Sequence, residues 1–253
     1  MAQDLLEGRV AVITGAGRGI GARTAQRFAR AGAKVAVNYL RNRTAAEEVT
    51  RTITNAGGEA IAVQADVRET GPVADMIASV TERLGPPDTL VLNADAGGFR
   101  PSPVTRLEAA AYESRLVDEM RAAFVPVRAV LPGMLASGRG SILAISSALC
   151  RAPVPGFSLL AVSKGALEAF VRSLAVELGP HGIRVNTIEA SMIEGENSDA
   201  VDDGRRDALR ERIPLRRFGR PDDVAGLATL IASDMAGFVN GAAIPVNGGQ
   251  ILY

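Results

Sequence analysis

The chain has 253 residues, 47% of them hydrophobic and 22% charged, a length and composition that suit one α/β domain. Twenty-eight basic residues balance twenty-eight acidic ones, which excludes a basic footprint for nucleic acid or for a membrane surface. The single cysteine, Cys150, excludes an intramolecular disulfide, and the single histidine, His181, excludes a Cys/His metal cluster. No secretory signal or apolar run of membrane-spanning length is visible, so we expect a cytoplasmic protein.

Short runs of β-branched residues alternate with longer segments of helical periodicity. The predicted strands are 9–14, 34–38, 60–64, 89–92, 141–145 and 184–188, and the predicted helices include 20–31, 44–56, 73–84 and 107–136. Buried strands separated by helices favour a doubly wound (Rossmann) parallel sheet of about seven strands with helices on both faces. We expect one domain over 1–253, with the charged stretch 194–212 as a mobile flap.

A glycine-rich loop lies between the first predicted strand and the first predicted helix, where the sequence reads TGAGRGIG. Glycines permit a sharp turn there and allow a pyrophosphate to approach the backbone closely. The start of the helix adds free N–H groups and the positive end of its dipole. The loop therefore predicts a nucleotide-binding site at Gly15, Arg18, Gly19, Ile20 and Gly21.

The residues after the second predicted strand favour NADP(H) over NAD(H). A cofactor with a free 2′-hydroxyl usually meets an Asp or Glu roughly twenty residues after the first glycine. Here Asn38 occupies that place, Arg41 and Arg43 follow it, and Arg18 lies in the glycine loop. Arginines suit a 2′-phosphate because they form fork-like, charge-assisted hydrogen bonds. The alternative, that Arg41 and Arg43 only solvate a loop, stays open.

With these motifs on view, the chain resembles the short-chain dehydrogenase/reductase family over nearly its whole length. The glycine loop resembles the family's TGxxxGxG motif, the LVLNA run resembles most of its NNAG motif, and the tail from 212 to 249 resembles the ketoacyl-reductase-like branch. The resemblance implies adenine contacts by Asp66 and Val67 and further cofactor contacts by Asn93, Lys164 and Ile193. It also implies a small-molecule substrate and a homo-oligomer, a tetramer or a dimer, built on the two long helices and the C-terminal segment.

The family's chemistry uses a tyrosine to protonate a carbonyl oxygen, a lysine one helical turn later and a serine that polarises the carbonyl. By resemblance, Lys164 matches the lysine and Ser147 the serine, with Ser146 as a register alternative. The tyrosine position, four residues before the lysine, is Leu160. Enoyl-reductase relatives place a tyrosine seven residues before the lysine, and that position is Phe157. Neither side chain can donate a proton.

Other family positions around the nicotinamide differ as well. The asparagine of the long helix is replaced by Glu119, and the glycine that ends the NNAG motif is replaced by Asp95. The family's Pro-Gly pair after the sixth strand is replaced by Ala190 and Ser191, and a family threonine is replaced by Gly195. We assign Glu119 to the catalytic site with Ser147 and Lys164, while a solvated surface position for Glu119 and Asp95 stays equally open.

Two classes of function remain. The first is an NADP(H)-dependent carbonyl reductase for a small or polyketide-like substrate with an atypical proton source. That source is an acid on the substrate, a water relayed through Lys164 and Glu119, or a carboxyl group of Asp95 or Glu194. The second is an NADP(H)-binding protein without redox turnover, either a non-redox catalyst or an inactive partner of an active homologue. We expect no metal site, nucleic acid or membrane partner for either class.

Overall fold

The computed structural model describes residues 4–95, 100–195, 198 and 203–252. In this part of the chain a sheet of seven parallel strands has the order β3-β2-β1-β4-β5-β6-β7. The strands are β1 Val10–Ile13, β2 Lys34–Tyr39, β3 Ala60–Gln64, β4 Thr89–Leu92, β5 Gly140–Ser147, β6 Ile183–Ala190 and β7 Ala243–Val246. The α-helices are α1 Gly19–Arg30, α2 Arg43–Asn55, α3 Thr70–Leu84, α4 Ala109–Ser137, α5 Ser158–Leu178, α7 Asp203–Glu211 and α8 Pro221–Ala232.

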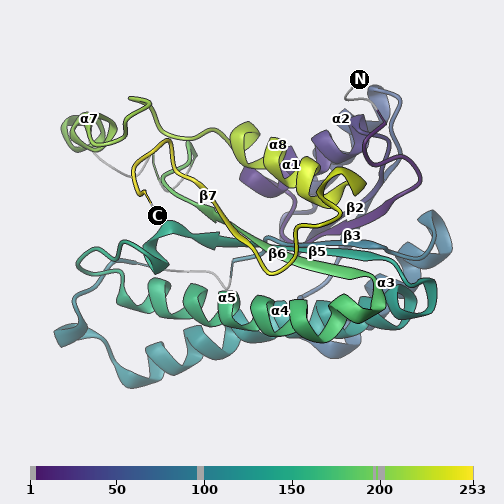
Figure 1. Ribbon diagram of the computed structural model, residues 1–253, viewed down its shortest axis with the longest axis horizontal. Helices are drawn as coiled ribbons and strands as arrows, with labels where there is room; N and C mark the ends of the chain where they lie inside the picture. Colours follow the sequence, from purple (N-terminus) through teal and green to yellow (C-terminus); the bar gives the residue numbers. More distant parts are fainter. Residues whose placement is uncertain (1–3, 96–99, 196–197, 199–202, 253) are drawn as a thin grey trace.

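Helices cover both faces of the sheet, as Figure 1 shows: α1, α2 and α8 lie on one face, and α3, α4 and α5 lie on the other. Apart from Thr89, the central strands β1 and β4 are apolar, because both of their faces are buried. Each face has its own cluster of buried aliphatic side chains. The predicted doubly wound α/β fold is confirmed.

Two features of the C-terminal third escape the sequence patterns. Strand β7 contains Pro245, which breaks the strand pattern, and it lies half-buried at the sheet edge rather than buried like β1 and β4. Within the predicted flap 194–212, residues 203–211 form helix α7, whereas 196–197 and 199–202 lie outside the described residues. That this segment acts as a flap stays a prediction.

The parallel arrangement brings the expected site residues to one edge of the sheet. The glycine loop follows β1, Asn93 and Asp95 follow β4, and Ser147 ends β5. Because carboxyl ends of parallel strands share an edge, these segments border one crevice, the usual place for a ligand in such sheets.

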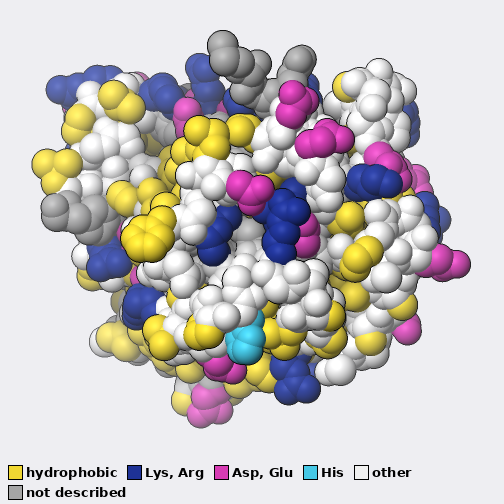
Figure 2. Space-filling view, turned by 45° about the vertical axis from the view of Figure 1, so that its right-hand side comes forward, with side chains coloured by type: hydrophobic (Ala, Val, Ile, Leu, Met, Phe, Trp, Pro, Cys, Tyr) yellow, Lys and Arg dark blue, Asp and Glu magenta, His cyan; other side chains and the backbone are white. Residues whose placement is uncertain are grey.

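The charges on the molecule are mixed in sign. On the face in Figure 2, Lys and Arg side chains stand among Asp and Glu side chains, and neither sign covers a broad area. This agrees with the balance of basic and acidic residues in the sequence. Among the described helices, none combines the length and the apolar character that crossing a bilayer requires.

Candidate active site

The glycine loop is tight on its protein side and open at the start of α1. A Cβ atom on Gly21 would lie 2.5 Å from the side-chain nitrogen of Asn93 and 2.9 Å from Cα of Ala16. Gly19 has φ +55°, which disfavours any side chain, and nothing lies within 4 Å of the Cβ position there. The first turn of α1 contains no acidic residue. This open cradle fits the phosphates of a dinucleotide.

Two asparagine side chains hold the loop in shape. The Asn38 amide oxygen accepts a hydrogen bond from the N–H of Gly15 at 3.1 Å, and its amide nitrogen donates to the carbonyl of Ala65 at 3.1 Å. Asn93 donates to the carbonyls of Thr14 and Gly15 at 3.0 and 3.1 Å. Asn38 is only 2% exposed, so its side chain supports the loop from the protein interior. Sequence reasoning assigned it to the cofactor alone.

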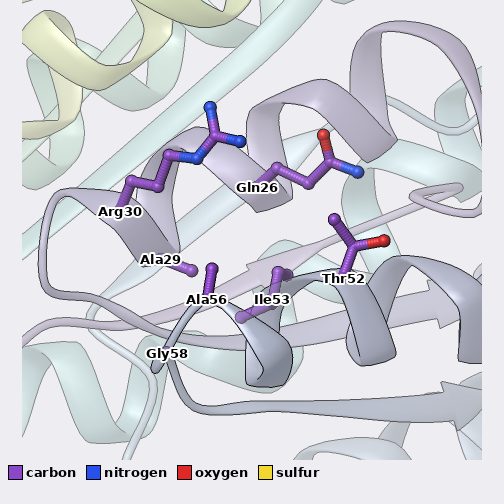
Figure 3. Close-up of a pocket in the computed structure, with 7 residues that line it drawn as sticks. All are labelled: Gln26, Ala29, Arg30, Thr52, Ile53, Ala56 and Gly58. Carbon is purple, nitrogen blue, oxygen red and sulfur yellow. The ribbon is translucent and has the colours of Figure 1, made fainter.

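A cavity of about 360 Å³ lies beside the start of α1, lined by Gly19, Ala22, Arg23, Gln26, Glu194, Arg220, Pro221 and Asp222. It contains one residue predicted to bind the cofactor and one from the predicted flap. A second cavity, between α1 and α2, measures about 20 Å³ (Figure 3). The residues around it belong to α1, to α2 and to the turn after α2 that contains Ala56 and Gly58, and it has room for roughly one water molecule. Of the two, only the cavity of about 360 Å³ beside the glycine loop is placed to receive a ligand.

The end of β2 carries no carboxylate that could bind a ribose 2′-hydroxyl. Arg41 is exposed, and the Nε atom of Arg43 donates to the hydroxyl of Tyr39 at 3.2 Å. The Asn42 side chain accepts from the N–H of Ala45 and caps α2. Arg18 lies in the glycine loop directly before α1, with an extended backbone. Arg41 follows β2, the strand that pairs with β1.

The predicted adenine contact, Asp66, lies beside an arginine that sequence reasoning did not consider. Arg68 donates to both carboxylate oxygens, at 2.9 Å from Nε and 2.7 Å from Nη2, and its Nη1 reaches Asp118 at 3.0 Å. These hydrogen bonds, chiefly the side-chain ones from Arg68, lower the pKa of Asp66 and keep it ionised. Val67 is buried. The adenine role of both residues stays a prediction.

Lys164 is buried at the centre of the predicted catalytic group. Its Nζ atom donates to the Oε1 atom of Glu119 at 2.8 Å and to the carbonyl oxygen of Ile145 at 3.1 Å. Glu119 is only 3% exposed. The open question about Glu119 is therefore decided in favour of a buried position against the lysine. The carbonyl of Ile145 precedes Ser147 by two residues, so Lys164 is tied to the end of β5.

A buried arginine links the two acidic residues that depart from the family pattern. The Nη2 atom of Arg115 lies 3.2 Å from the Oε2 atom of Glu119 and also binds the Oδ1 atom of Asp95. Asp95 itself is more than half exposed. Sequence reasoning missed Arg115, although its spacing of four residues from Glu119 along α4 was a signal that the two could meet.

The two neighbouring serines at the end of β5 have different surroundings. Ser146 donates to the buried carboxylate of Glu168 on α5 at 2.7 Å. Ser147 accepts the N–H of Leu149 at 3.3 Å and is half-buried. Because Ser146 already serves the packing of α5 against the sheet, the geometry favours Ser147 as the serine of the site.

Leu160 lies in the first turn of α5, one turn before Lys164, and is half-buried. Burial raises the pKa of the nearby Cys150 thiol to about 11, so it is protonated near neutrality and is a poor nucleophile. Ile193 pairs with Gly219 in a short parallel bridge, which places it after β6, beside the segment that leads into α8. None of these three residues supplies an acid at the tyrosine position.

The comparisons with known proteins agree with this picture. Residues 15–250 match the family model described as enoyl-(acyl carrier protein) reductase. The chain is 38% identical to an uncharacterized oxidoreductase of Methylorubrum extorquens, covering 96% of this chain and 98% of that protein. It is 33% identical to 3-oxoacyl-[acyl-carrier-protein] reductase of Staphylococcus epidermidis, with the same coverage. The chain therefore belongs to the short-chain dehydrogenase/reductase family and is an oxidoreductase of that type.

A solved structure shows how closely the fold follows the family. The gluconate 5-dehydrogenase of Burkholderia cenocepacia, crystallised with NADP and tartrate, superposes with a TM-score of 0.90 at 32% identity. The likeness covers 98% of both chains. The fold thus follows this relative over nearly the whole chain.

Proposed function

We propose that the protein is an NADP(H)-dependent carbonyl reductase that acts on a small or polyketide-like ketone without the family tyrosine. The observation that carries this proposal is the position of Lys164, buried and bonded to the carbonyl of Ile145 at 3.1 Å, beside the strand that ends in Ser147. Lys164 and Ser147, which the resemblance matches to the family's lysine and serine, support this proposal. A cytoplasmic location stays a prediction.

The cofactor would be held by the open cradle of the glycine loop. Gly15, Gly19 and Gly21 would receive the phosphates, and Arg18 and Arg41 would bind a 2′-phosphate. NADPH supplies the hydride when it is bound, and the ketone takes that hydride at carbon and a proton at oxygen to give an alcohol. The NADP complex of the gluconate 5-dehydrogenase supports the choice of NADP(H).

Ser147 would orient and polarise the ketone oxygen, and the proton would come through Lys164 and Glu119. An ammonium group has three N–H donors, and contacts to Glu119 and Ile145 use two of them. The third can hold a water in place of the missing phenol.

Of the other two acids considered for this proton, Asp95 is bonded to Arg115 with 57% of its side chain exposed, and Glu194 lies 3.9 Å from Arg220 with 47% exposed. Glu119, in contrast, is buried and bonded directly to Lys164, which supports the relay through Lys164 and Glu119.

The proposal is tested by following NADPH oxidation with a panel of aliphatic ketones, aromatic ketones and β-ketoesters. We expect measurable oxidation by the wild type, and a gain on simple ketones for Leu160→Tyr that approaches the roughly 10²–10⁴-fold typical of a positioned general acid. Lys164→Ala should lose most of the turnover. If the wild type binds NADPH tightly but no ketone causes its oxidation, and Lys164→Ala behaves in the same way, the result would instead support a protein without redox turnover.

A homo-oligomer built on α4 and α5 is part of the same proposal. The outer sides of these helices carry exposed apolar side chains, with Val117 55%, Phe124 47% and Val176 80% exposed. Burying such a face stabilises an assembly through the hydrophobic effect. Light scattering on the purified protein should give a dimer or tetramer, and a monomer at micromolar concentration would contradict this part.

A further inference from the structure

Charged side chains of alternating sign connect the end of β4 to the middle of α5. From the surface inward they are Asp95, Arg115, Glu119 and Lys164, with side-chain exposures of 57%, 5%, 3% and 11%. Two positive and two negative charges make the chain neutral as a whole. Buried charges of this kind are tolerated only when each is paired.

Arg115 fixes the direction of the Glu119 carboxylate. Glu119 presents Oε2 to Arg115 at 3.2 Å and Oε1 to Lys164 at 2.8 Å, so each oxygen has its own cation. The terminal torsion of a glutamate rotates easily when only one oxygen is bonded. With both oxygens bonded, the carboxylate plane is set, and so is the place of the ammonium group that it binds.

Lys164, the innermost member of this series of charged side chains, is one of very few lysines in the protein. The sequence contains only two lysines, Lys34 and Lys164, among 28 basic residues. Lys34 lies on the surface with 45% of its side chain exposed, where it pairs with Glu59. A compact ammonium, unlike a guanidinium, is suited to holding a hydroxyl or a water while it shares its proton.

We propose that Arg115 is a positioning residue for Lys164, acting through Glu119, with Asp95 as its outer anchor. Arg115 need not touch substrate or cofactor. Its effect is to keep the Lys164 ammonium beneath the end of β5, where the proposed function uses it. This inference therefore rests on that function, but the position of the lysine can be measured without cofactor or ketone.

Reductive methylation with ¹³C-formaldehyde provides that measurement, because Lys34 serves as an internal standard within the same chain. In the wild type we expect strong labelling of Lys34 and weak labelling of Lys164. Arg115→Met should raise the labelling of Lys164 about tenfold, since one hydrogen bond to a charged group is worth that factor. Arg115→Gln, which keeps an N–H donor, should give an intermediate value.

A matched control lies on the same helix. Arg121 on α4 donates to the carbonyl of Arg68 and reaches Glu69 at the surface, away from Glu119. Arg121→Met should leave the labelling of Lys164 as in the wild type. If Arg115→Met labels Lys164 no more than Arg121→Met does, Arg115 does not position the lysine. If Arg115→Met does not fold, the same comparison is made with Arg115→Gln.

NADPH affinity gives the second readout, measured by fluorescence titration without ketone. Arg115→Met should weaken NADPH binding about tenfold by the same reasoning. The double variant with Glu119→Gln should bind no more weakly than Glu119→Gln alone, because Arg115 acts only through Glu119. Additive losses would overturn the inference. A wild type that binds NADPH but reduces no ketone would overturn the proposed function and leave the lysine labelling result intact.

Discussion

The two ends of the crevice are shaped by different kinds of chemical group. At the phosphate end, the loop is shaped by backbone groups and neutral amides: Asn38 accepts from Gly15, and Asn93 donates to Thr14 and Gly15. At the opposite end the groups are charged side chains, and a hydrogen bond to Glu119 holds the Lys164 ammonium in position. The first end depends on the absence of side chains, whereas the second depends on the balance of charges.

This difference fits the sequence resemblance, in which the glycine loop follows the family pattern and the residues around Lys164 depart from it. A glycine packed against backbone has no substitute, because any Cβ at Gly21 would come within 3 Å of three neighbours. A charge, however, can be exchanged when another charge compensates it. Asp95 and Glu119 are negative at positions where the resemblance implies neutral residues, and Arg115 lies between them. The nicotinamide end could thus change without loss of the fold.

The charged end should show the largest effect on stability. Glu119→Leu leaves the Lys164 ammonium with only the Ile145 carbonyl, and removing one partner of a buried pair typically costs about 3–5 kcal/mol. We expect the free energy of unfolding in urea to fall by that amount. The double variant Glu119→Leu/Lys164→Met should recover much of the loss, because no unpaired ammonium remains. A loss below about 1 kcal/mol for the single variant would show that the pair is not buried as described.

The phosphate end should show a smaller loss of stability with a complete loss of binding. A methyl group on Gly21 would meet Asn93, the carbonyl oxygen of Gly15 and Cα of Ala16 at 2.5 to 2.9 Å. Such overpacking costs about 1–3 kcal/mol and distorts the phosphate cradle, so Gly21→Ala should bind no NADPH in a fluorescence titration.

Gly17 provides the control within the same loop. A Cβ there would lie 3.6 Å from the nearest atom, an ordinary contact, and the backbone is not in the left-handed region. Gly17→Ala should keep its stability within about 0.5 kcal/mol of the wild type. Equal losses in Gly17→Ala and Gly21→Ala would refute the packing explanation.

A surface charge cluster between α1 and α8 should have the smallest effect. The hydrogen bond from Arg23, assisted by Arg27, lowers the pKa of Asp222 to about 2 from its ordinary value of 3.8. Because the folded-state pKa is lower than the unfolded one, this pair stabilises the protein above about pH 4, and its contribution disappears as the pH falls towards about 2.

Asp222→Asn tests this sign. With about a third of the side chain exposed, the loss at pH 7 should stay below about 1 kcal/mol. Urea unfolding curves of the variant and the wild type should differ at pH 7 and converge near pH 2. A difference that grows on acidification would contradict the assignment.

Sequence reasoning recovered the elements whose signal is local. The strand before the glycine loop and the strand that ends in Ser147 are buried on both sides and were predicted from their apolar runs. Strand β7 lacks that signal because it contains Pro245 and is half-buried. Helix α7 lay in a stretch whose charges indicated a loop.

For the candidate site, single residues were easier to predict than their contacts. The glycine motif marked the loop, and the family spacing marked Lys164. No local pattern could show that Asn38 supports the loop, since its partners come from 15 and 65. For Arg115, the spacing of four residues from Glu119 was a local signal, but its contact with Asp95 was not predictable because Asp95 reaches it from another element.

Deuteride transfer is the most direct test of a reductase that lacks the family tyrosine at position 160. The wild type is incubated with [4-²H]NADPH and a ketone from the panel, and the product is analysed by mass spectrometry. Carbonyl reduction requires an alcohol with one deuterium at the former carbonyl carbon, formed by the wild type and in much smaller amount by Lys164→Ala. Saturating NADPH binding without deuterium in any product, for either stereoisomer of the labelled cofactor, would contradict it.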